Sequence, residues 1–273
     1  MLQSRILDET PNIILTLFDK IKYKYPNLYI RENRIILDMT DIENIIYISK
    51  IPNNDIKDIT NYSHTIEDQI HKSNKKYIMG YDDNNQVVGI SEICAIQFVD
   101  TFVKICEIIF AHIDLIDIIY DDTKLVVMIN IRIYNASELV EIIQLKHPKL
   151  YIRSKQCEIT FPQESEKNNI EYKKTICDCD FDKIVRYSSQ MERRILQSKK
   201  NTAKYIIGIM DSGEIIGLTN SETIKSIDVF INICDIIGAS ITIIDIINVD
   251  HNIIIMAGIK KNITRYHNND FMF

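Results

Sequence analysis

The pattern of hydrophobic and polar positions predicts short strands interleaved with helices along the whole chain. Some segments have apolar residues at three- and four-residue spacing, which is typical of helices that bury one face. Other apolar runs are short and bounded by Asn, Asp, Gly or Pro, which favours strands. The predicted helices span residues 11–24, 55–74, 91–112, 137–146, 181–199 and 221–238. The predicted strands span residues 28–30, 35–37, 45–51, 115–120, 125–133, 150–153, 157–161, 170–176, 240–247 and 252–259, with hairpins at 77–90, 204–218 and around the turn 31–34.

The same order of elements occurs twice because the sequence itself is repeated. Residues 76–110 match residues 204–238 at a constant offset of 128, including Phe102 with Phe230 and Cys106 with Cys234. An earlier block, residues 26–31, returns as residues 148–153 at an offset of 122. Such internal repetition indicates duplication of a structural unit. We therefore expect two homologous lobes, residues 1–134 and 135–273, each α+β with a mainly antiparallel sheet and two to three helices.

Composition places the chain among ordinary globular proteins. Its 273 residues are 46% hydrophobic and 26% charged, which is sufficient for two compact units. No apolar run reaches the ~18 residues of a membrane span, and the N-terminus lacks the apolar stretch of a signal peptide, so we expect a cytoplasmic protein with no membrane partner. The six cysteines are expected to be buried thiols. The abundance of Ile, Asn and Lys is typical of an AT-rich genome, such as that of a protist or a large DNA virus.

Two familiar kinds of site are excluded by the residues around them. Gly208 and Gly213 have the spacing of a phosphate-binding loop, but Glu214 and Ile215 follow where Lys and Ser or Thr are needed. Asp211 adds negative charge to the same loop, so a β-turn is the better interpretation. Cys177 and Cys179 lack the further ligands of a zinc site.

The first candidate site is a basic segment of the second lobe. Residues 183–204 contain seven cations and one acid, Glu192, although the whole chain has a formal net charge of −6. Cations at this density, with Tyr187 and Gln190 between them, are typical of a helix that contacts phosphates, although a solvated helix face has the same composition. The candidate RNA-binding residues are Lys183, Arg186, Arg193, Arg194, Lys199, Lys200 and Lys204.

The second candidate site consists of three acids of the same lobe, Glu166, Glu171 and Asp211. Three convergent carboxylates can hold Mg²⁺ or Mn²⁺ for phosphodiester cleavage, because hard cations prefer oxygen ligands and activate water. The first lobe has Ile46 in place of Glu171, so such an activity would be confined to the second lobe. Ordinary surface acids are the alternative.

Two family resemblances rest on these residues. The first rests on Glu171-Tyr172-Lys173, residues 190–194, residues 203–208 and Asp211-Ser212-Gly213. This stretch of about 75 residues resembles the region before the G domain in elongation-factor-like GTPases of the GTP-binding protein 1 type. It implies a link to translation, aminoacyl-tRNA and RNA turnover. Because the chain ends where the G domain would start, GTP hydrolysis is not expected. The run from Glu166 to Lys173, with Asp211, resembles the Schlafen core, a two-lobed clamp around tRNA, and implies a metal-dependent endoribonuclease.

Three functions therefore remain open. The leading hypothesis is a translation-associated module that binds tRNA, the ribosome or translation factors, without a cofactor and without GTPase activity. The second is an endoribonuclease of tRNA or rRNA that uses Glu166, Glu171 and Asp211 with Mg²⁺ or Mn²⁺. The third is a non-catalytic protein–protein adaptor.

Overall fold

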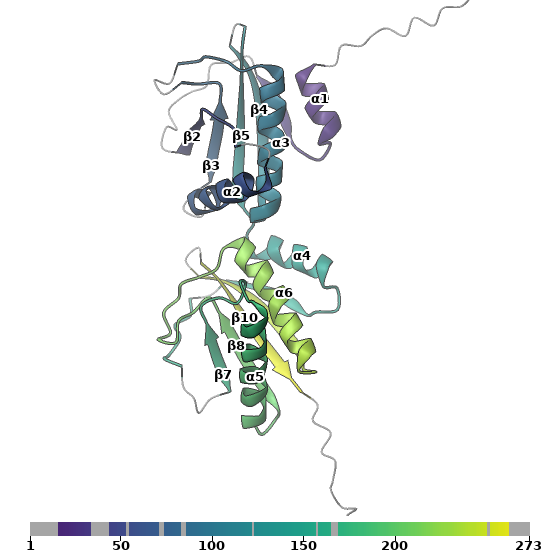
Figure 1. Ribbon diagram of the computed structural model, residues 1–273, viewed down its shortest axis with the longest axis vertical. Coiled ribbons are helices and arrows are strands. Elements are labelled where there is room, and N and C mark those ends of the chain that lie inside the picture. The colour runs from purple at the N-terminus through teal and green to yellow at the C-terminus, as the bar shows by residue number, and fades with distance from the viewer. Residues whose placement is uncertain are drawn as a thin grey trace, which may run out of the picture. The chain divides into compact units, whose positions relative to one another are not determined.

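The computed structural model describes residues 16–33, 44–52, 55–70, 74–82, 86–121, 123–156, 158–164, 169–249 and 252–261. The chain divides into two compact units. Residues Met1–Glu107 and His112–Arg132 form the first unit, and residues Ile108–Ala111 and Ile133–Phe273 form the second. Each unit combines a five-stranded sheet with helices (Figure 1), as the sequence predicts.

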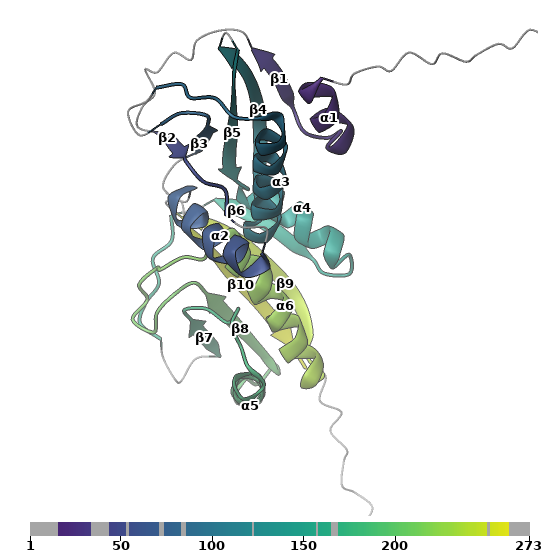
Figure 2. The ribbon, with the colours of Figure 1, turned by 45° about the horizontal axis from the view of Figure 1, so that its top comes forward.

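The described residues of the first unit form three helices and one mixed sheet. The helices are α1 (Leu17–Lys24), α2 (Ile56–Ile70) and α3 (Glu92–Ile109). The strands are β1 (Ile30–Asn33), β2 (Ile45–Ile48), β3 (Lys75–Met79), β4 (Ala111–Asp121) and β5 (Lys124–Ile133), in the order β1-β4-β5-β3-β2. Both edge strands are parallel to their neighbours, whereas β3 and β5 are antiparallel. Figure 2 shows β1 at the edge of this sheet, beside β4.

The second unit has the same topology with different residues. Its helices are α4 (Ala136–Lys146), α5 (Phe181–Gln197) and α6 (Asn220–Ile236). Its strands are β6 (Ile152–Gln156), β7 (Ile170–Lys173), β8 (Thr202–Ile207), β9 (Ser240–Val249) and β10 (Asn252–Lys260), in the order β6-β9-β10-β8-β7. Each strand takes the place of its counterpart in the first sheet. The duplication inferred from the sequence is therefore also a duplication of the fold.

The two faces of the second sheet pack against different partners. Strand residues alternate between faces, so Tyr205 and Ile207 of β8 belong to the core beneath the helices, together with Phe230 of α6. The intervening Ile206 belongs to a smaller cluster on the other face, which Phe161 helps to cover. An aromatic contact is repeated in the two units: Tyr205 and Phe230 have ring centroids 5.5 Å apart. The corresponding pair in the first unit, Tyr77 and Phe102, has centroids 5.0 Å apart.

An ion pair between a half-exposed arginine and a buried aspartate joins each first strand to its neighbour. Arg31 of β1 stands opposite Asp117 of β4, and its guanidinium donates to both carboxylate oxygens at 2.6 and 2.9 Å. Arg153 of β6 stands opposite Asp245 of β9 and donates to it at 2.7 and 3.2 Å. Lys155 Nζ adds a third bond to Asp245 at 2.7 Å. The repeated Leu-Tyr-Ile-Arg block therefore supplies the same contact in both lobes.

Some predicted elements differ from the observed ones. The turn predicted around residues 31–34 is wrong, because β1 continues through Asn33 and pairs in parallel with β4, which lies more than 80 residues later. The predicted strand 35–37 lies outside the described residues. Residues 158–161 form no strand, although they were predicted as part of one. The first helix begins at Leu17 after a Thr16 cap, and residues 11–15 lie outside the described part. The central strand pairs are antiparallel as predicted, whereas the edge pairs are parallel, so each sheet is mixed.

Candidate nucleic-acid interface

Helix α5, which carries most of the predicted RNA-binding cations, is a strongly amphipathic helix with a clear start. The carboxylate of Asp180 accepts the backbone N–H of Lys183 at 2.8 Å and so caps the helix. Its inner face buries Ser188, Met191 and Ile195. The exposed polar or charged residues of the helix are Asp182, Lys183, Arg186, Ser189, Arg193 and Gln197.

The seven predicted cations do not form one surface. Five are exposed and lie on α5 or in the turn that follows it: Lys183, Arg186, Arg193, Lys199 and Lys200. Arg194 is only 3% exposed, because its position faces the sheet. Lys204 alternates with Ala203 and Tyr205 on β8, so it projects from the sheet face opposite the helices. Arg194 and Lys204 therefore do not belong to the same surface as the other five cations, which corrects the predicted interface.

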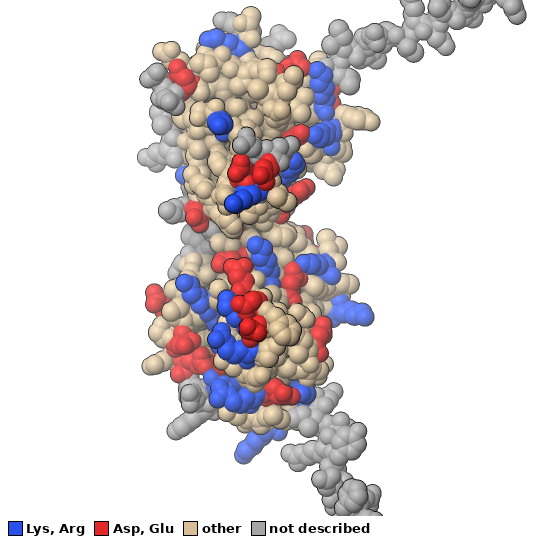
Figure 3. Space-filling view, viewed as in Figure 1, with Lys and Arg blue, Asp and Glu red and all other residues tan. Residues whose placement is uncertain are grey.

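More acids lie near the predicted interface than were counted within residues 183–204. Asp178, Asp180 and Asp182 immediately precede the counted cations. Glu192, within the segment, accepts a bond from Lys261 Nζ. Figure 3 shows blue and red side chains interspersed over the unit that contains α5. The local field is thus weaker than the count of seven cations implied.

Arg194 is buried because it lies between two carboxylates at the edge of the sheet. Its Nε donates to Glu171 Oε2 at 2.5 Å, and its Nη2 donates to Glu164 Oε1. Lys173 Nζ donates to the other oxygen of Glu171 at 2.6 Å. The other oxygen of Glu164 accepts the backbone N–H of Tyr172 at 3.2 Å, on the edge strand β7. Two acids and two cations therefore form a network without net charge.

This network sets the pKa values of its two acids in opposite directions. Burial by itself raises the pKa of Glu171, but the bonds from Lys173 and Arg194 outweigh burial, and the pKa lies below its ordinary value. Burial raises the pKa of Glu164, and the nearby charges of Glu171 and Asp211 add to this effect. The bond from the Tyr172 N–H and the charge of Arg194 act against it without reversing it.

Two of the three predicted metal ligands, Glu171 and Asp211, lie in the described part of the chain. Glu166 lies outside the described residues. Both oxygens of Glu171 accept hydrogen bonds from cations, so a metal would have to displace Lys173 and Arg194. Asp211 is in the hairpin turn, where its backbone oxygen accepts the N–H of Glu164 at 2.8 Å. Within the described ranges, no group of three or more His, Cys, Asp or Glu side chains could hold a metal ion.

The turn that resembled a phosphate loop is a structural turn, as the sequence indicated. Gly213 has φ of 90°, and a Cβ at this position would lie 2.2 Å from the carbonyl oxygen of Phe161. Glycine is therefore required by close backbone packing. The turn closes with a bond from Met210 N to the Glu214 oxygen at 2.9 Å.

Glu164 is the residue of the network that sequence analysis missed. It stands in a segment without regular structure, and no periodicity marks its role. The repeat held a signal for its partner pair, although not for Glu164 itself. Between the two matched blocks the offset is 125, which pairs Glu171 with Ile46 and Arg194 with Gln69, so an acid and a cation appear together in the second lobe where the first has neutral residues. This correlated difference indicates that the two side chains meet.

Comparison with known proteins gives one similarity of note. No protein-family model matches the chain. The uncharacterized protein R625 of Acanthamoeba polyphaga mimivirus is 42% identical over 122 residues, which are 44% of this chain and 66% of that protein. The matched length is close to that of one lobe, and a viral relative agrees with the composition typical of an AT-rich genome. Among the helices described, none is long and apolar enough to cross a membrane.

Proposed function

We propose that the protein is a non-catalytic RNA-binding module, linked to translation, that contacts phosphates through the outer face of α5. The observation that supports this proposal is the charge difference between α5 and its counterpart α2. At the offset of 125, Lys183, Arg186 and Arg193 replace Asp58, Asn61 and Asp68. The buried positions of the two helices keep their character, because Ser188, Met191 and Ile195 replace Ser63, Ile66 and Ile70.

The exposed cations are spaced suitably for a polyanion. Arg186 and Arg193 are seven residues apart and thus lie on the same side of α5, separated by about 10 Å along its axis. Lys199 and Lys200 extend the positive surface beyond the helix end. Arg side chains in such a row can each contact a different phosphate, and such contacts add affinity without demanding a particular base sequence.

Charge removal on this face tests the proposal. In the variant Arg186→Gln, Arg193→Gln, Lys200→Gln, we expect tRNA affinity to fall by roughly tenfold or more at low salt. The slope of log affinity against log salt should become shallower by about two to three, because three phosphate contacts are lost. Filter binding between about 50 and about 200 mM salt measures both quantities.

A matched control separates local contacts from total charge. Lys149→Gln, Lys225→Gln, Lys260→Gln removes three exposed cations of the same unit, each outside α5. We expect this variant to retain most of its affinity and its salt slope. Equal losses in the two variants would show that only net charge matters, and an unchanged α5 variant would exclude this helix as the contact.

The adaptor function is the second candidate because α5 also exposes apolar side chains. Phe181, Val185 and Leu196 are all exposed, and their spacing places them on one side of the helix, next to the row of arginines. Phe181→Ser and Leu196→Ser together should leave tRNA affinity unchanged if the arginines alone bind RNA. The endoribonuclease hypothesis has less support, because Glu171 is held by two cations.

A further inference from the structure

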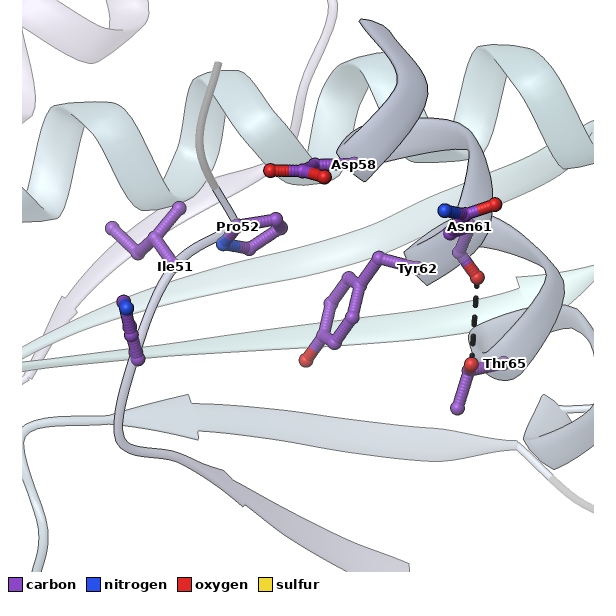
Figure 4. A pocket seen from close by; sticks show the side chains of 7 residues that line it. Ile51, Pro52, Asp58, Asn61, Tyr62 and Thr65 are labelled. Atoms are coloured by element: carbon purple, nitrogen blue, oxygen red, sulfur yellow. Dashed lines mark hydrogen bonds between the residues drawn. The ribbon is translucent and has the colours of Figure 1, made fainter. Parts of the chain in front are cut away.

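The first unit contains a pocket on α2 that the RNA-binding proposal does not use. It has a volume of about 410 Å³, within the usual range of small-ligand sites. Figure 4 shows the ring of Tyr62 pointing from α2 into the space beside Ile51 and Pro52, with Asp58 and Asn61 on the same helix. The pocket thus offers an aromatic ring and a carboxylate close together.

The second lobe shows what contacts the equivalent ring. Tyr187 is the counterpart of Tyr62 at the offset of 125. The guanidinium carbon of Arg186 lies 5.4 Å from the centroid of the Tyr187 ring, and Lys173 Nζ lies 5.5 Å from it. Both distances are within the range of cation–π attraction. The tyrosine at this place in the duplicated fold is therefore covered by cations of its own chain.

The first lobe has lost both of these internal cations. Asn61 stands where the second lobe has Arg186, and Ile48 stands where it has Lys173. At the same time Asp58 replaces Lys183, so the lining has gained a carboxylate. Substitution of long cations by shorter residues leaves space beside the ring, and the acid changes the charge that the space favours.

We propose that this pocket binds an alkylguanidinium group, from either a small molecule or an arginine side chain of a peptide. A guanidinium lies over the Tyr62 ring, as Arg186 lies over Tyr187, and donates hydrogen bonds to the Asp58 carboxylate. Lys50 also lines the pocket and carries an opposing charge. Its side chain is exposed and flexible, whereas Asp58 is half-buried, so the lysine can turn into water when a cation enters.

A titration of the full chain with paired ligands tests this assignment. The probes are N-acetyl-arginine amide and its neutral citrulline isostere, followed by ligand-observed NMR up to about 10 mM. We expect the arginine compound to bind in roughly the millimolar range and the citrulline compound to bind at least several-fold more weakly. Equal affinities of the two compounds, or no binding of either, would overturn the proposal.

Four variants locate the binding to this pocket. Asp58→Asn should weaken binding roughly three- to tenfold, whereas Asp68→Asn, the same change at an exposed position of the same helix, should have less than about a twofold effect. Asn61→Arg restores the residue of the second lobe and should abolish binding, because its own guanidinium covers the ring. Lys50→Ala should strengthen binding. Weaker binding in Lys50→Ala would contradict the opposing role of this lysine and overturn the assignment, and equal effects of the two aspartate changes would indicate non-specific attraction.

The source of the guanidinium is decided by a further comparison. Propylguanidinium carries the group alone, and the peptide Gly-Gly-Arg-Gly-Gly carries it on a backbone. Tighter binding of the peptide assigns the pocket to an arginine of a protein partner, and equal or tighter binding of propylguanidinium assigns it to a small molecule. Circular dichroism of each variant confirms that it is folded. None of these results depends on α5, so failure of the RNA proposal leaves this inference unaffected.

Discussion

At the scale of single residues, the two lobes place different side chains beside the same buried tyrosine. In the first lobe the Tyr77 hydroxyl donates to Gln69 Oε1 at 3.2 Å. In the second lobe Arg194 replaces Gln69 and turns to its carboxylates, and the buried Tyr205 hydroxyl has no hydrogen-bond partner among the described residues. The second lobe therefore has the buried ion pair of Arg194 in place of the tyrosine hydrogen bond that the first lobe retains.

Replacing Glu171 and Arg194 by the residues of the first lobe should change the stability of the protein in a predictable way. Glu171→Ile alone should lower the free energy of unfolding by about 3 kcal/mol, because it removes one of the carboxylates that compensate the buried Arg194. Glu171→Ile combined with Arg194→Gln should recover much of this loss, since the glutamine can accept from Tyr205 as Gln69 accepts from Tyr77. Urea unfolding measures all three proteins. A double variant less stable than the single one would show that the two lobes are not equivalent here.

The contribution of Asp245 to the stability of the protein should depend on pH. Burial raises its pKa, but hydrogen bonds from Arg153 and Lys155 outweigh burial, so the pKa lies below its ordinary value of about 3.9. A lowered carboxyl pKa adds stability above the unfolded-state pKa, and this contribution disappears as pH falls through the folded-state value. The stability difference between the parent and Asp245→Asn should therefore be largest near neutral pH and shrink below about pH 4.

Urea unfolding at a series of pH values measures this difference. Glu164, whose raised pKa has the opposite sign, is present in both proteins and cancels in the comparison. Asp235→Asn, at an exposed position of α6, is the matched control and should show little difference at any pH. A difference for Asp245→Asn that stays constant with pH would mean that packing, and not the charge, is what the aspartate contributes.

At the scale of elements, the sequence predicted the starts of the helices after the first to within one residue, but it did not predict the partners of the edge strands. Asn135 caps α4 by accepting the N–H groups of Ser137 and Glu138, and Glu138 accepts the N–H of Asn135 in return. All of these partners lie within three residues, so local sequence specifies them. The partners of β1 and β6 lie far along the chain. Hydrophobic patterning indicates which face of a strand is buried, but it does not identify the neighbouring strand.

Loss of the α4 cap should have a small and local cost. Asn135→Ala removes the acceptor for two backbone N–H groups and should lower the free energy of unfolding by about 1 kcal/mol. Asn135→Asp, which keeps an acceptor, should lose much less. Thermal unfolding measures both variants against Glu141→Ala, an exposed position of the same helix, for which we expect a change within about 0.5 kcal/mol. An equal loss for Asp and Ala would contradict a capping role.

At the scale of the whole molecule, duplication made the architecture predictable and limited what the sequence could say of function. Two matched blocks fixed the order of elements, and the shared strand order follows from them. The exposed residues have diverged, as Asp68 and Arg193 show, so the function of one lobe does not indicate that of the other. Arg194 was misassigned for a related reason: a count of charges does not distinguish a cation that faces solvent from one that faces the sheet.

The ion pairs of the first strands have a consequence for how the chain reaches its fold. Arg31 and Arg153 present the same donors to Asp117 and Asp245 at the same register, so we infer that β1 and β6 can each pair with either partner strand. A full-length chain that refolds from denaturant holds both strands and both acceptors at once, and an exchanged pairing competes with the native one. During synthesis, Asp117 emerges before β6 exists. We therefore expect vectorial synthesis to favour the native pairing over the exchanged one.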